Sequence, residues 1–460
     1  MQFHYRDHVI NLLDTPGHED FSEDTYRVLT AVDAAVMVID AAKGVEAQTI
    51  KLLEVCRMRK TPIITFINKF DREVRDPLDL LGEIENVLKL QCVPITWPIG
   101  MGKTFRGVFS LLKNHLVRFT AGEDRLTEDR ELIEGLDNPE LDELYPMEMP
   151  YVRESIELVQ GATDPFDLRK FLAGEQSPVF FGSGVNNFGV EDVLNALVDW
   201  APRPQPRDAG VRMVDPFEDH FSGFVFKIQA NMDPRHRDRI AFLRVCSGCY
   251  TPGMKVFHVR EGKEMKIPNA LTFMAQERKR MEEAVAGDII GIYNHGQLHI
   301  GDTLTEGEKL GFVGIPFFAP ELFRSVRCKN PFKEKQLRQG LQELGEEGAI
   351  QVFTDDLGHI YLGAVGILQF EIVAQRLATE YRVDAIYEST EVSTARWLVF
   401  PDDKGKTREE FEAEQASRLA TDADGNLVYL ATSVYNLQTT QKHWENVQFL
   451  TTREMGQKFN

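Results

Sequence analysis

The sequence has no apolar run approaching the roughly 18 residues of a membrane-spanning helix, and Met1–Tyr5 has no apolar signal core. We therefore expect no membrane partner and a cytoplasmic location. Cysteine is also scarce, with five scattered residues, which is typical of reduced thiols rather than of a disulfide framework. Cys246 and Cys249 form one C-x-x-C pair without a second pair at zinc-binding spacing, so we interpret them as buried strand or turn residues.

Basic residues are few relative to acidic ones: 52 Lys and Arg stand against 72 Asp and Glu, a net charge of −20. This balance argues against indiscriminate nucleic-acid binding, because phosphates repel an anionic protein. Two local basic stretches still suit phosphate contacts to RNA. They are Arg235, Arg237 and Arg239, and then Arg324, Arg327, Lys329, Lys333, Lys335 and Arg338.

Half of the net negative charge lies in residues 121–160, which hold thirteen acidic and three basic residues. We interpret this segment as a solvated helical insert. An acidic docking surface for a protein partner is the alternative.

The length of 460 residues predicts roughly three domains, and a hydrophobic content of 43% is ample for packed cores. Short apolar runs at 9–13, 35–39, 62–67 and 179–181 alternate with polar or helical segments. This pattern is typical of a parallel β-sheet with helices on both faces. A proline-rich linker at 201–206 ends this α/β domain, which we place at residues 1–205.

Many short strands and frequent turns follow the linker and predict an antiparallel β-barrel over residues 206–310. The remainder, 311–460, mixes element types and predicts an α+β domain. Within it, one helix face is expected at Phe370, Val373, Ala374 and Leu377. Strands are expected before and after that helix, at Ala349–Phe353 and Val383–Tyr387.

The first motif with a chemical signature is Asp14-Thr15-Pro16-Gly17-His18, directly after the first apolar run. Ligands of open α/β sheets bind beyond the carboxyl ends of the strands. There, Asp14 can hold Mg²⁺ through water, and Gly17 lets a backbone N–H approach a γ-phosphate. His18 is the candidate catalytic residue, since it can orient an attacking water.

The second motif, Asn68-Lys69-Phe70-Asp71, ends the apolar run at 62–67. The Asp71 carboxylate can accept two hydrogen bonds from the N–H edge of guanine, a pattern that adenine does not offer. Lys69 can lie along the base, and Asn68 can tie the loop together. A third segment, Gly182-Ser183-Gly184, follows the run at 179–181, where a backbone N–H can meet the guanine carbonyl. The motifs together predict binding of GTP or GDP with Mg²⁺.

A P-loop is missing from this set, because no G-x-x-x-x-G-K-[ST] stands between a strand and a helix. Gly100–Thr104 ends in Gly-Lys-Thr, but Trp97 occupies the position of the first glycine. The segment also follows the base-reading motif, in the wrong chain order. We therefore expect Gly100–Thr104 to serve some purpose other than phosphate binding.

At these motifs the chain resembles the translational GTPases, in particular at Asp14–Thr25 and Asp40–Gln48. Further segments are similar to the family of bacterial class-II peptide chain release factors, known as release factor three. They are Pro94–Val108, Gly223–Phe242, Asn269–Arg278, Gly363–Val373 and Ser393–Trp397.

The resemblance implies a GTP-hydrolysing factor that binds the terminating ribosome, its RNA and its proteins, and promotes departure of class-I release factors. It implies a monomer with an incomplete P-loop GTPase domain, an elongation-factor-like barrel and a C-terminal α+β domain. By residue, Asp14, Thr15, Pro16 and Gly17 would serve magnesium and phosphate, and His18 would position water. Asn68, Lys69, Phe70 and Asp71 would bind guanine, and Ser183 and Gly184 would complete that pocket.

The family pattern places a P-loop and a first switch before Met1, so we expect a chain shortened at its N-terminus. The expected consequence is weak nucleotide binding and little hydrolysis by this chain alone. Two alternatives remain open. One is a protein without the P-loop and first switch that binds the ribosome or a release factor without hydrolysis. The other is an elongation-factor translocase, which would need further domains.

Overall fold

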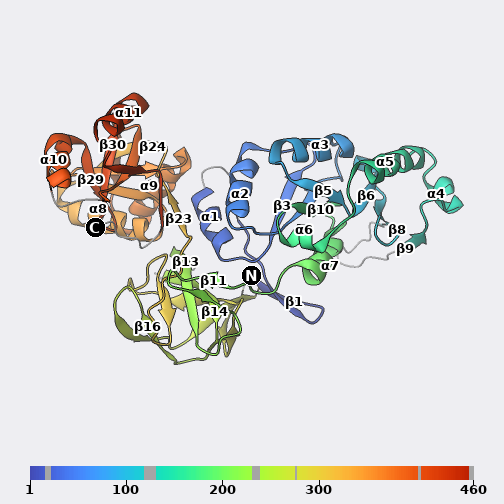
Figure 1. Ribbon diagram of the computed structural model, residues 1–460, viewed down its shortest axis with the longest axis horizontal. Coiled ribbons are helices and arrows are strands. Elements are labelled where there is room, and N and C mark those ends of the chain that lie inside the picture. The colour runs from blue at the N-terminus through green and yellow to red at the C-terminus, as the bar shows by residue number, and fades with distance from the viewer. Residues whose placement is uncertain (16–21, 119–130, 231–238, 275–276, 402–405, 455–460) are drawn as a thin grey trace. The chain divides into compact units, whose positions relative to one another are not determined.

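The computed structural model describes residues 1–15, 22–118, 131–230, 239–274, 277–401 and 406–454 (Figure 1). The chain forms two compact units. Unit 1 comprises Met1–His4, Val9–Ala31 and Pro204–Asn460. Unit 2 comprises Tyr5–His8 and Val32–Arg203. Among the described residues, no helix combines the length and the apolar character needed to cross a membrane.

A four-stranded parallel sheet, in the order β3-β4-β10-β5, forms the centre of unit 2. Helices cover both faces, with α2 and α3 on one side and α6 and α7 on the other (Figure 1). Phe171 of α6 and Val193 of α7 pack with Phe66 of β4 in one core. The bounds are β3 Ala35–Asp40, β4 Ile63–Asn68, β5 Gln91–Pro94, β10 Gln176–Phe181, α2 Ala47–Met58, α3 Pro77–Leu88, α6 Leu168–Leu172 and α7 Val190–Trp200. This arrangement confirms the predicted α/β fold.

The first apolar run departs from the prediction. We expected residues 9–13 to join the parallel sheet, but β2 (His8–Asn11) forms a two-stranded hairpin with β1 (Gln2–Tyr5). The physical reason is incomplete burial. Val9 and Leu12 are 49% and 40% exposed, whereas a strand inside a parallel sheet must be buried on both faces.

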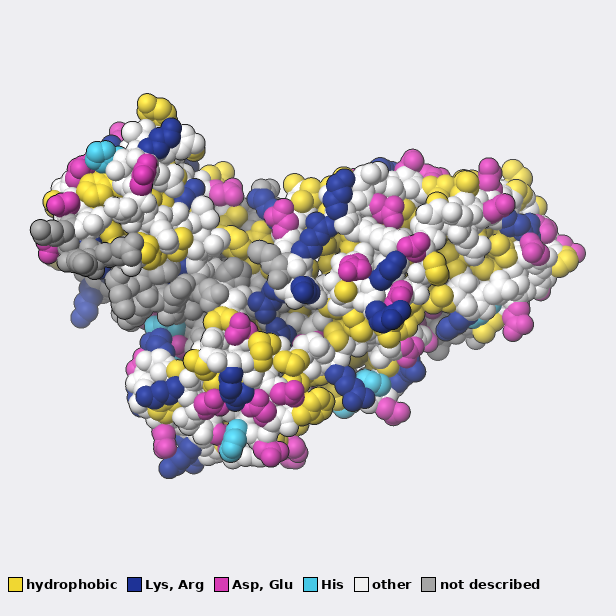
Figure 2. All heavy atoms as spheres, viewed as in Figure 1, with side chains coloured by type: hydrophobic (Ala, Val, Ile, Leu, Met, Phe, Trp, Pro, Cys, Tyr) yellow, Lys and Arg dark blue, Asp and Glu magenta, His cyan; other side chains and the backbone are white. Residues whose placement is uncertain are grey.

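An insert with its own antiparallel sheet, in the order β6-β7-β8-β9, follows β5. Its elements are β6 Thr96–Ile99, η2 Gly102–Thr104, β7 Gly107–Ser110, β8 His115–Arg118, β9 Glu131–Glu134, α4 Pro139–Leu144 and α5 Met149–Ala162. The acidic segment 121–160 is therefore not helical throughout, since its described part starts with strand β9. Asn138 caps α4 by accepting a hydrogen bond from the backbone N–H of Glu140 (3.0 Å). Acidic and apolar side chains share the surface around α4 and α5 (Figure 2).

Unit 1 contains an eight-stranded antiparallel sheet in the order β17-β16-β22-β13-β14-β21-β18-β19, as the barrel prediction required. Its main strands are β13 Ser222–Ala230, β14 Arg239–Ser247, β16 Lys255–His258, β17 Lys263–Lys266, β18 Ala270–Met274, β19 Glu277–Met281, β21 Ile289–Tyr293 and β22 Thr303–Thr305. Short pairs flank it: β11 Arg207–Asp208 with β12 Met213–Val214, and β15 Cys249–Tyr250 with β20 Ala284–Val285. Both predicted strand or turn cysteines lie in strands: Cys246 is buried in β14, as expected, whereas Cys249 in β15 is only half-buried.

The C-terminal part of unit 1 is a mixed domain around a second eight-stranded sheet, in the order β27-β24-β26-β25-β29-β30-β28-β31. The predicted helix face is confirmed in α9, where Phe370, Val373 and Leu377 are buried. The strands are β23 Pro316–Phe318, β24 Leu322–Cys328, β25 Gln351–Thr354, β26 Ile360–Ala364, β27 Ala385–Glu388, β28 Thr394–Val399, β29 Leu419–Asp422, β30 Leu427–Ala431, β31 Gln448–Leu450 and β32 Thr452–Glu454. The helices are η3 Pro331–Lys333, α8 Glu334–Glu346, α9 Ile367–Glu380, α10 Lys406–Gln415, η4 Ala416–Arg418 and α11 Val434–His443.

Candidate guanine-nucleotide site

The predicted base-reading loop, Asn68–Asp71, leaves the carboxyl end of β4, and the Ser183–Gly184 turn leaves the carboxyl end of β10. These strands are parallel neighbours, with Ile67 opposite Phe181, so the two segments lie at one edge of the sheet. They are also bonded to each other. The side-chain oxygen Oδ1 of Asn68 accepts a hydrogen bond from the Gly184 N–H at 2.8 Å. The backbone joins them again where the Phe70 N–H donates to the Gly182 carbonyl at 3.1 Å.

Asp71 is held by the turn opposite it. The Ser183 hydroxyl donates to Oδ1 of Asp71 at 2.6 Å, and Arg72 Nε lies 4.0 Å from the other carboxylate oxygen. An ionised carboxylate has about four acceptor sites, so the Ser183 bond leaves capacity for the two N–H donors of guanine. The Asp71 side chain is 24% exposed and thus accessible to a base.

Lys69 is fixed by a carboxylate that the sequence analysis did not assign. Its Nζ donates to Oδ2 of Asp40 at 2.6 Å. Asp40 ends β3 and lies opposite Asn68 in the parallel register. Burial alone would raise the pKa of Asp40, but the hydrogen bonds from Lys69 and from backbone amides outweigh burial and hold that pKa below its usual range. The sequence did offer a signal for the Asp40–Lys69 pair, because Asp40 ends the apolar run next to the one that precedes Lys69.

Phe70 stands among the predicted nucleotide-binding residues, but its side chain is completely buried. Its ring packs against Phe105 (5.8 Å between centroids) and against Phe181 (5.4 Å, edge to face). The Phe70 side chain thus anchors the loop from inside and presents no surface to a nucleotide.

The Gly100–Thr104 segment does not have the connectivity of a P-loop. It connects strands β6 and β7 through the single 3₁₀ turn η2, whereas a P-loop connects a strand to a helix. Its Gly102 N–H donates to the Phe70 carbonyl at 2.8 Å.

Only part of the first predicted motif, Asp14–His18, lies within the described residues. Asp14 is exposed and Thr15 half-buried after β2, and both belong to unit 1, whereas the base-reading loop belongs to unit 2. Pro16, Gly17 and His18 lie outside the described residues.

The magnesium prediction lacks a complete ligand set. Mg²⁺ prefers six oxygen ligands, but within the described ranges no group of three or more His, Cys, Asp or Glu residues can hold a metal. Asp14 supplies one carboxylate at most.

The structure also changes which residues of the two predicted basic stretches are available to contact RNA. Arg235 and Arg237 lie outside the described residues. Arg239 is not available for RNA, because its Nε lies 3.1 Å from Oε1 of buried Glu347 and its Nη2 donates to the Glu343 carbonyl at 2.9 Å. In the second stretch, Arg324, Arg327, Lys329, Lys335 and Arg338 are exposed. RNA contact by that stretch stays a prediction.

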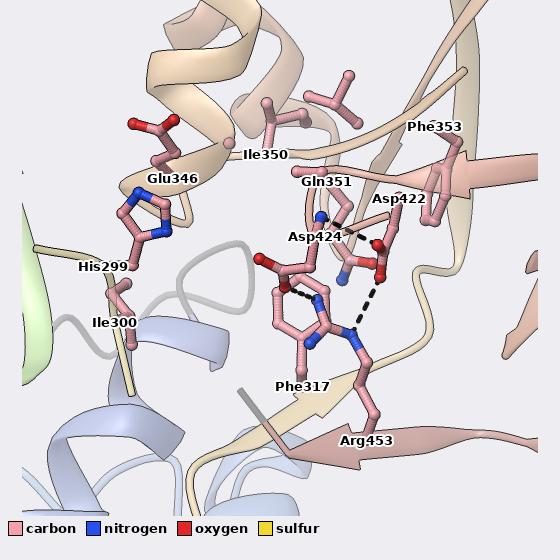
Figure 3. A pocket seen from close by; sticks show the side chains of 13 residues that line it. His299, Ile300, Phe317, Glu346, Ile350, Gln351, Phe353, Asp422, Asp424 and Arg453 are labelled. Carbon is pink, nitrogen blue, oxygen red and sulfur yellow. Dashed lines mark hydrogen bonds and ion pairs between the residues drawn. The ribbon is translucent and has the colours of Figure 1, made fainter. Parts of the chain in front are cut away.

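Unit 1 contains a pocket that the sequence did not suggest (Figure 3). Arg453 lies at its wall, 3.2 Å from Oδ2 of Asp422 and 2.5 Å from Oδ2 of Asp424, with its guanidinium 4.5 Å from the Phe317 ring centroid. Asp422 also accepts a hydrogen bond from the indole of Trp397 at 3.0 Å. One guanidinium bridges two carboxylates, and Asp422 is also bonded to Trp397, so we interpret the cluster as structural.

Three family models match successive parts of the chain. Residues 1–203 match the elongation factor Tu GTP binding domain, and residues 220–307 match elongation factor G domain 2. Residues 312–441 match the family described as class II release factor RF3, C-terminal domain. The first two matches define the class of this protein, the translational GTPases.

A relative from Aromatoleum aromaticum, described as peptide chain release factor 3, is 68% identical over 465 residues, which is 100% of this chain and 84% of the relative. This chain therefore belongs to the peptide chain release factor 3 family. A crystal structure from Thermus thermophilus has the same fold, with a TM-score of 0.67 and 23% identity over 87% of this chain. The chain spans 60% of that structure's length.

Proposed function

We propose that this protein is a cytoplasmic translation-termination factor that binds the ribosome and uses GTP to promote release of class-I release factors. The observation that carries the proposal is the 68% identity to a peptide chain release factor 3 over the whole chain. The bonded pairs Asn68–Gly184 and Asp71–Ser183 support it, because they hold Asn68 and the Asp71 carboxylate, groups that fit guanine, at one edge of the sheet. We propose that the protein acts as a monomer.

In the proposed mechanism, Asn68, Lys69 and Asp71 select guanine, and the Ser183–Gly184 turn lies beside them. The backbone N–H groups of this turn are engaged within the protein, Ser183 with the Phe188 carbonyl and Gly184 with Oδ1 of Asn68, so neither is assigned to the guanine carbonyl. His18 would orient the attacking water, with Thr15, Pro16 and Gly17 near the phosphates. Asp14 would contact Mg²⁺ through water, and the ion would need further ligands from outside the described residues. Magnesium supplies charge neutralisation at the phosphates when bound.

The sequence contains no P-loop motif, so the usual cradle for the β- and γ-phosphates is not among its residues. We infer that the 460-residue chain alone binds GTP weakly and hydrolyses it slowly. Saturable micromolar binding of GTP by the purified chain would contradict this inference.

Co-sedimentation with ribosomes tests the function. The purified chain is mixed with termination complexes that carry a class-I release factor, with and without millimolar GTP. Displacement of the class-I factor that requires GTP is the expected result. Ribosome binding that is indifferent to GTP would favour the alternative, a non-hydrolysing ribosome-binding protein. Failure to bind ribosomes would overturn both.

A further inference from the structure

The loop Gly100–Phe105 contacts Phe70 of the base-reading loop and Phe188, the partner of the Ser183–Gly184 turn. On one side, the Gly102 N–H donates to the Phe70 carbonyl at 2.8 Å, and the Phe105 ring lies 5.8 Å from the Phe70 ring. On the other side, the Phe105 ring lies 6.0 Å from that of Phe188. Phe188 pairs with Ser183 through two backbone hydrogen bonds of 3.0 and 2.9 Å. Phe105 thus joins the anchors of the base-reading loop and the Ser183–Gly184 turn.

The conformation of this loop depends on glycine at two positions. Gly100 has a φ of +75°, and a β-carbon there would lie 2.2 Å from the Thr104 carbonyl oxygen. Gly102 has a φ of +58°, with the Glu73 carboxylate 2.8 Å from the position of a β-carbon. The Thr104 hydroxyl closes the turn by donating to the Met101 carbonyl at 2.9 Å. The loop is therefore a tight, internally bonded support.

The support continues into the insert sheet. Phe105 is 7% exposed, and Phe70, Phe181 and Trp97 are completely buried. Trp97 of β6 packs against Phe181 at 5.5 Å, and Phe181 packs against Phe70. Aromatic pairs of this kind contribute beyond their buried area and restrict ring orientation. Because Asp71 directly follows Phe70, the position of its carboxylate depends on this cluster.

We propose that the Gly100–Phe105 loop positions the guanine-reading groups, with Phe105 and Gly102 as positioning residues for Asp71 and Ser183. The proposal rests on the proposed function, since it takes the ligand of this pocket to be a guanine base. It assigns a role to the Gly-Lys-Thr segment that phosphate binding does not explain. The loop would thereby determine how strongly the pocket prefers guanine to bases that lack a 2-amino group.

The test compares Phe105→Leu with Phe109→Leu in the full chain. Phe109 is also buried in the insert sheet, opposite Trp97 in the β6–β7 register, and is a matched control. Equilibrium dialysis measures binding of guanosine and inosine, which differ only in the 2-amino group that Asp71 would read. Nucleosides lack phosphates, so the missing P-loop motif does not affect the comparison. Hydrogen exchange measures protection of residues 66–72 and 182–189.

We expect Phe105→Leu to weaken guanosine binding about fivefold, because an aromatic contact of about 1 kcal/mol is lost. The guanosine-to-inosine affinity ratio should fall, and amide protection should decrease in both segments. Phe109→Leu should leave the ratio and both segments unchanged.

Equal weakening for both nucleosides, or the same result for both variants, would overturn the positioning role. If the unmodified chain binds no guanosine, the guanine-binding function itself fails. Hydrogen exchange then tests separately whether the Gly100–Phe105 loop supports the two segments. Unchanged protection in Phe105→Leu refutes support by this loop, and a loss confined to the two segments upholds it.

Discussion

The two predicted nucleotide-binding segments differ in what holds them in place. The base-reading loop is bonded within unit 2, through the contacts of Asn68 with Gly184 and of Asp71 with Ser183. The segment that begins at Asp14 leads into helix α1 (Ser22–Thr30), which belongs to unit 1. The base-reading loop is thus supported by the parallel sheet and its insert, whereas the helix that follows the other motif, α1, is supported by the barrel and the C-terminal domain.

The anchoring of α1 in unit 1 is extensive. Asp24 lies 2.6 Å from the ammonium group of Lys227 in the barrel. Buried Arg27 donates to the Gly348 carbonyl of the C-terminal domain at 2.9 Å. Val28 belongs to the barrel core. The comparison indicates that base selection and the placement of α1 depend on separate sets of packing contacts, so substitutions should affect one and spare the other.

The largest expected effect is that of Asp71→Asn on base selection. An amide has one oxygen and an N–H₂ group, so it loses one hydrogen bond to guanine and opposes a donor to a donor. Guanosine affinity should fall about 100-fold. Xanthosine affinity should rise, since xanthine offers an oxygen where guanine has its amino group. Equilibrium dialysis with both nucleosides measures the exchange of preference.

The control for this prediction is the stability of unit 1, which should be unaffected by Asp71→Asn. Hydrogen exchange in the barrel measures it. Unchanged guanosine affinity would show that Asp71 does not read the base.

The converse substitution is Arg27→Met in α1. It removes a buried charged donor and leaves the Gly348 carbonyl without this partner, which should destabilise unit 1 by about 2–3 kcal/mol. Guanosine affinity should not change. Urea denaturation followed by hydrogen exchange of α1 and of residues 343–350 measures the loss.

Arg6→Met is the matched control, because Arg6 forms an exposed ion pair with Asp199 (2.8 Å) and its loss should cost less than about 0.5 kcal/mol. If Arg27→Met instead lowers guanosine affinity, the separation of the two supports is wrong.

The base-reading residues were predictable because they are contiguous motifs at the ends of apolar strands. Parallel strands direct such ends to one edge of a sheet, so Asn68, Asp71 and Ser183 could be expected to meet. Asp40 was within reach of the same reasoning, since it ends the neighbouring strand.

Other contacts could not be predicted, because they arise from packing between distant segments. Nothing local in the sequence places Phe105 against Phe70, or Arg27 against Gly348. The first apolar run was misassigned because a five-residue segment with four apolar residues does not reveal whether neighbouring elements bury both of its faces. In the structure, Val9 remains half exposed.

The smallest expected effect concerns the pair Asp40–Lys69, which tests whether unit 2 holds its loop by charge as well as by packing. The pKa of Asp40 lies below its usual value, so its contribution to stability is present above about pH 4 and is lost as the pH falls through the lowered pKa. Asp40→Asn should therefore destabilise unit 2 by about 0.5–1 kcal/mol at pH 7, and the difference from the unmodified chain should vanish in acid.

Urea denaturation from pH 7 down to about pH 3 measures this difference. Lys69→Met is the matched control, because it removes the other partner and should give the same loss at neutral pH. A loss for Asp40→Asn that persists at low pH would mean that the hydrogen bonds from the Ala42 amide and its neighbour, rather than the charge of Lys69, fix the end of β3. The base-reading loop would then be positioned by backbone contacts, by the bonds of Asn68 and Asp71 to the Ser183–Gly184 turn and by Phe105, without a contribution from the charge of Lys69.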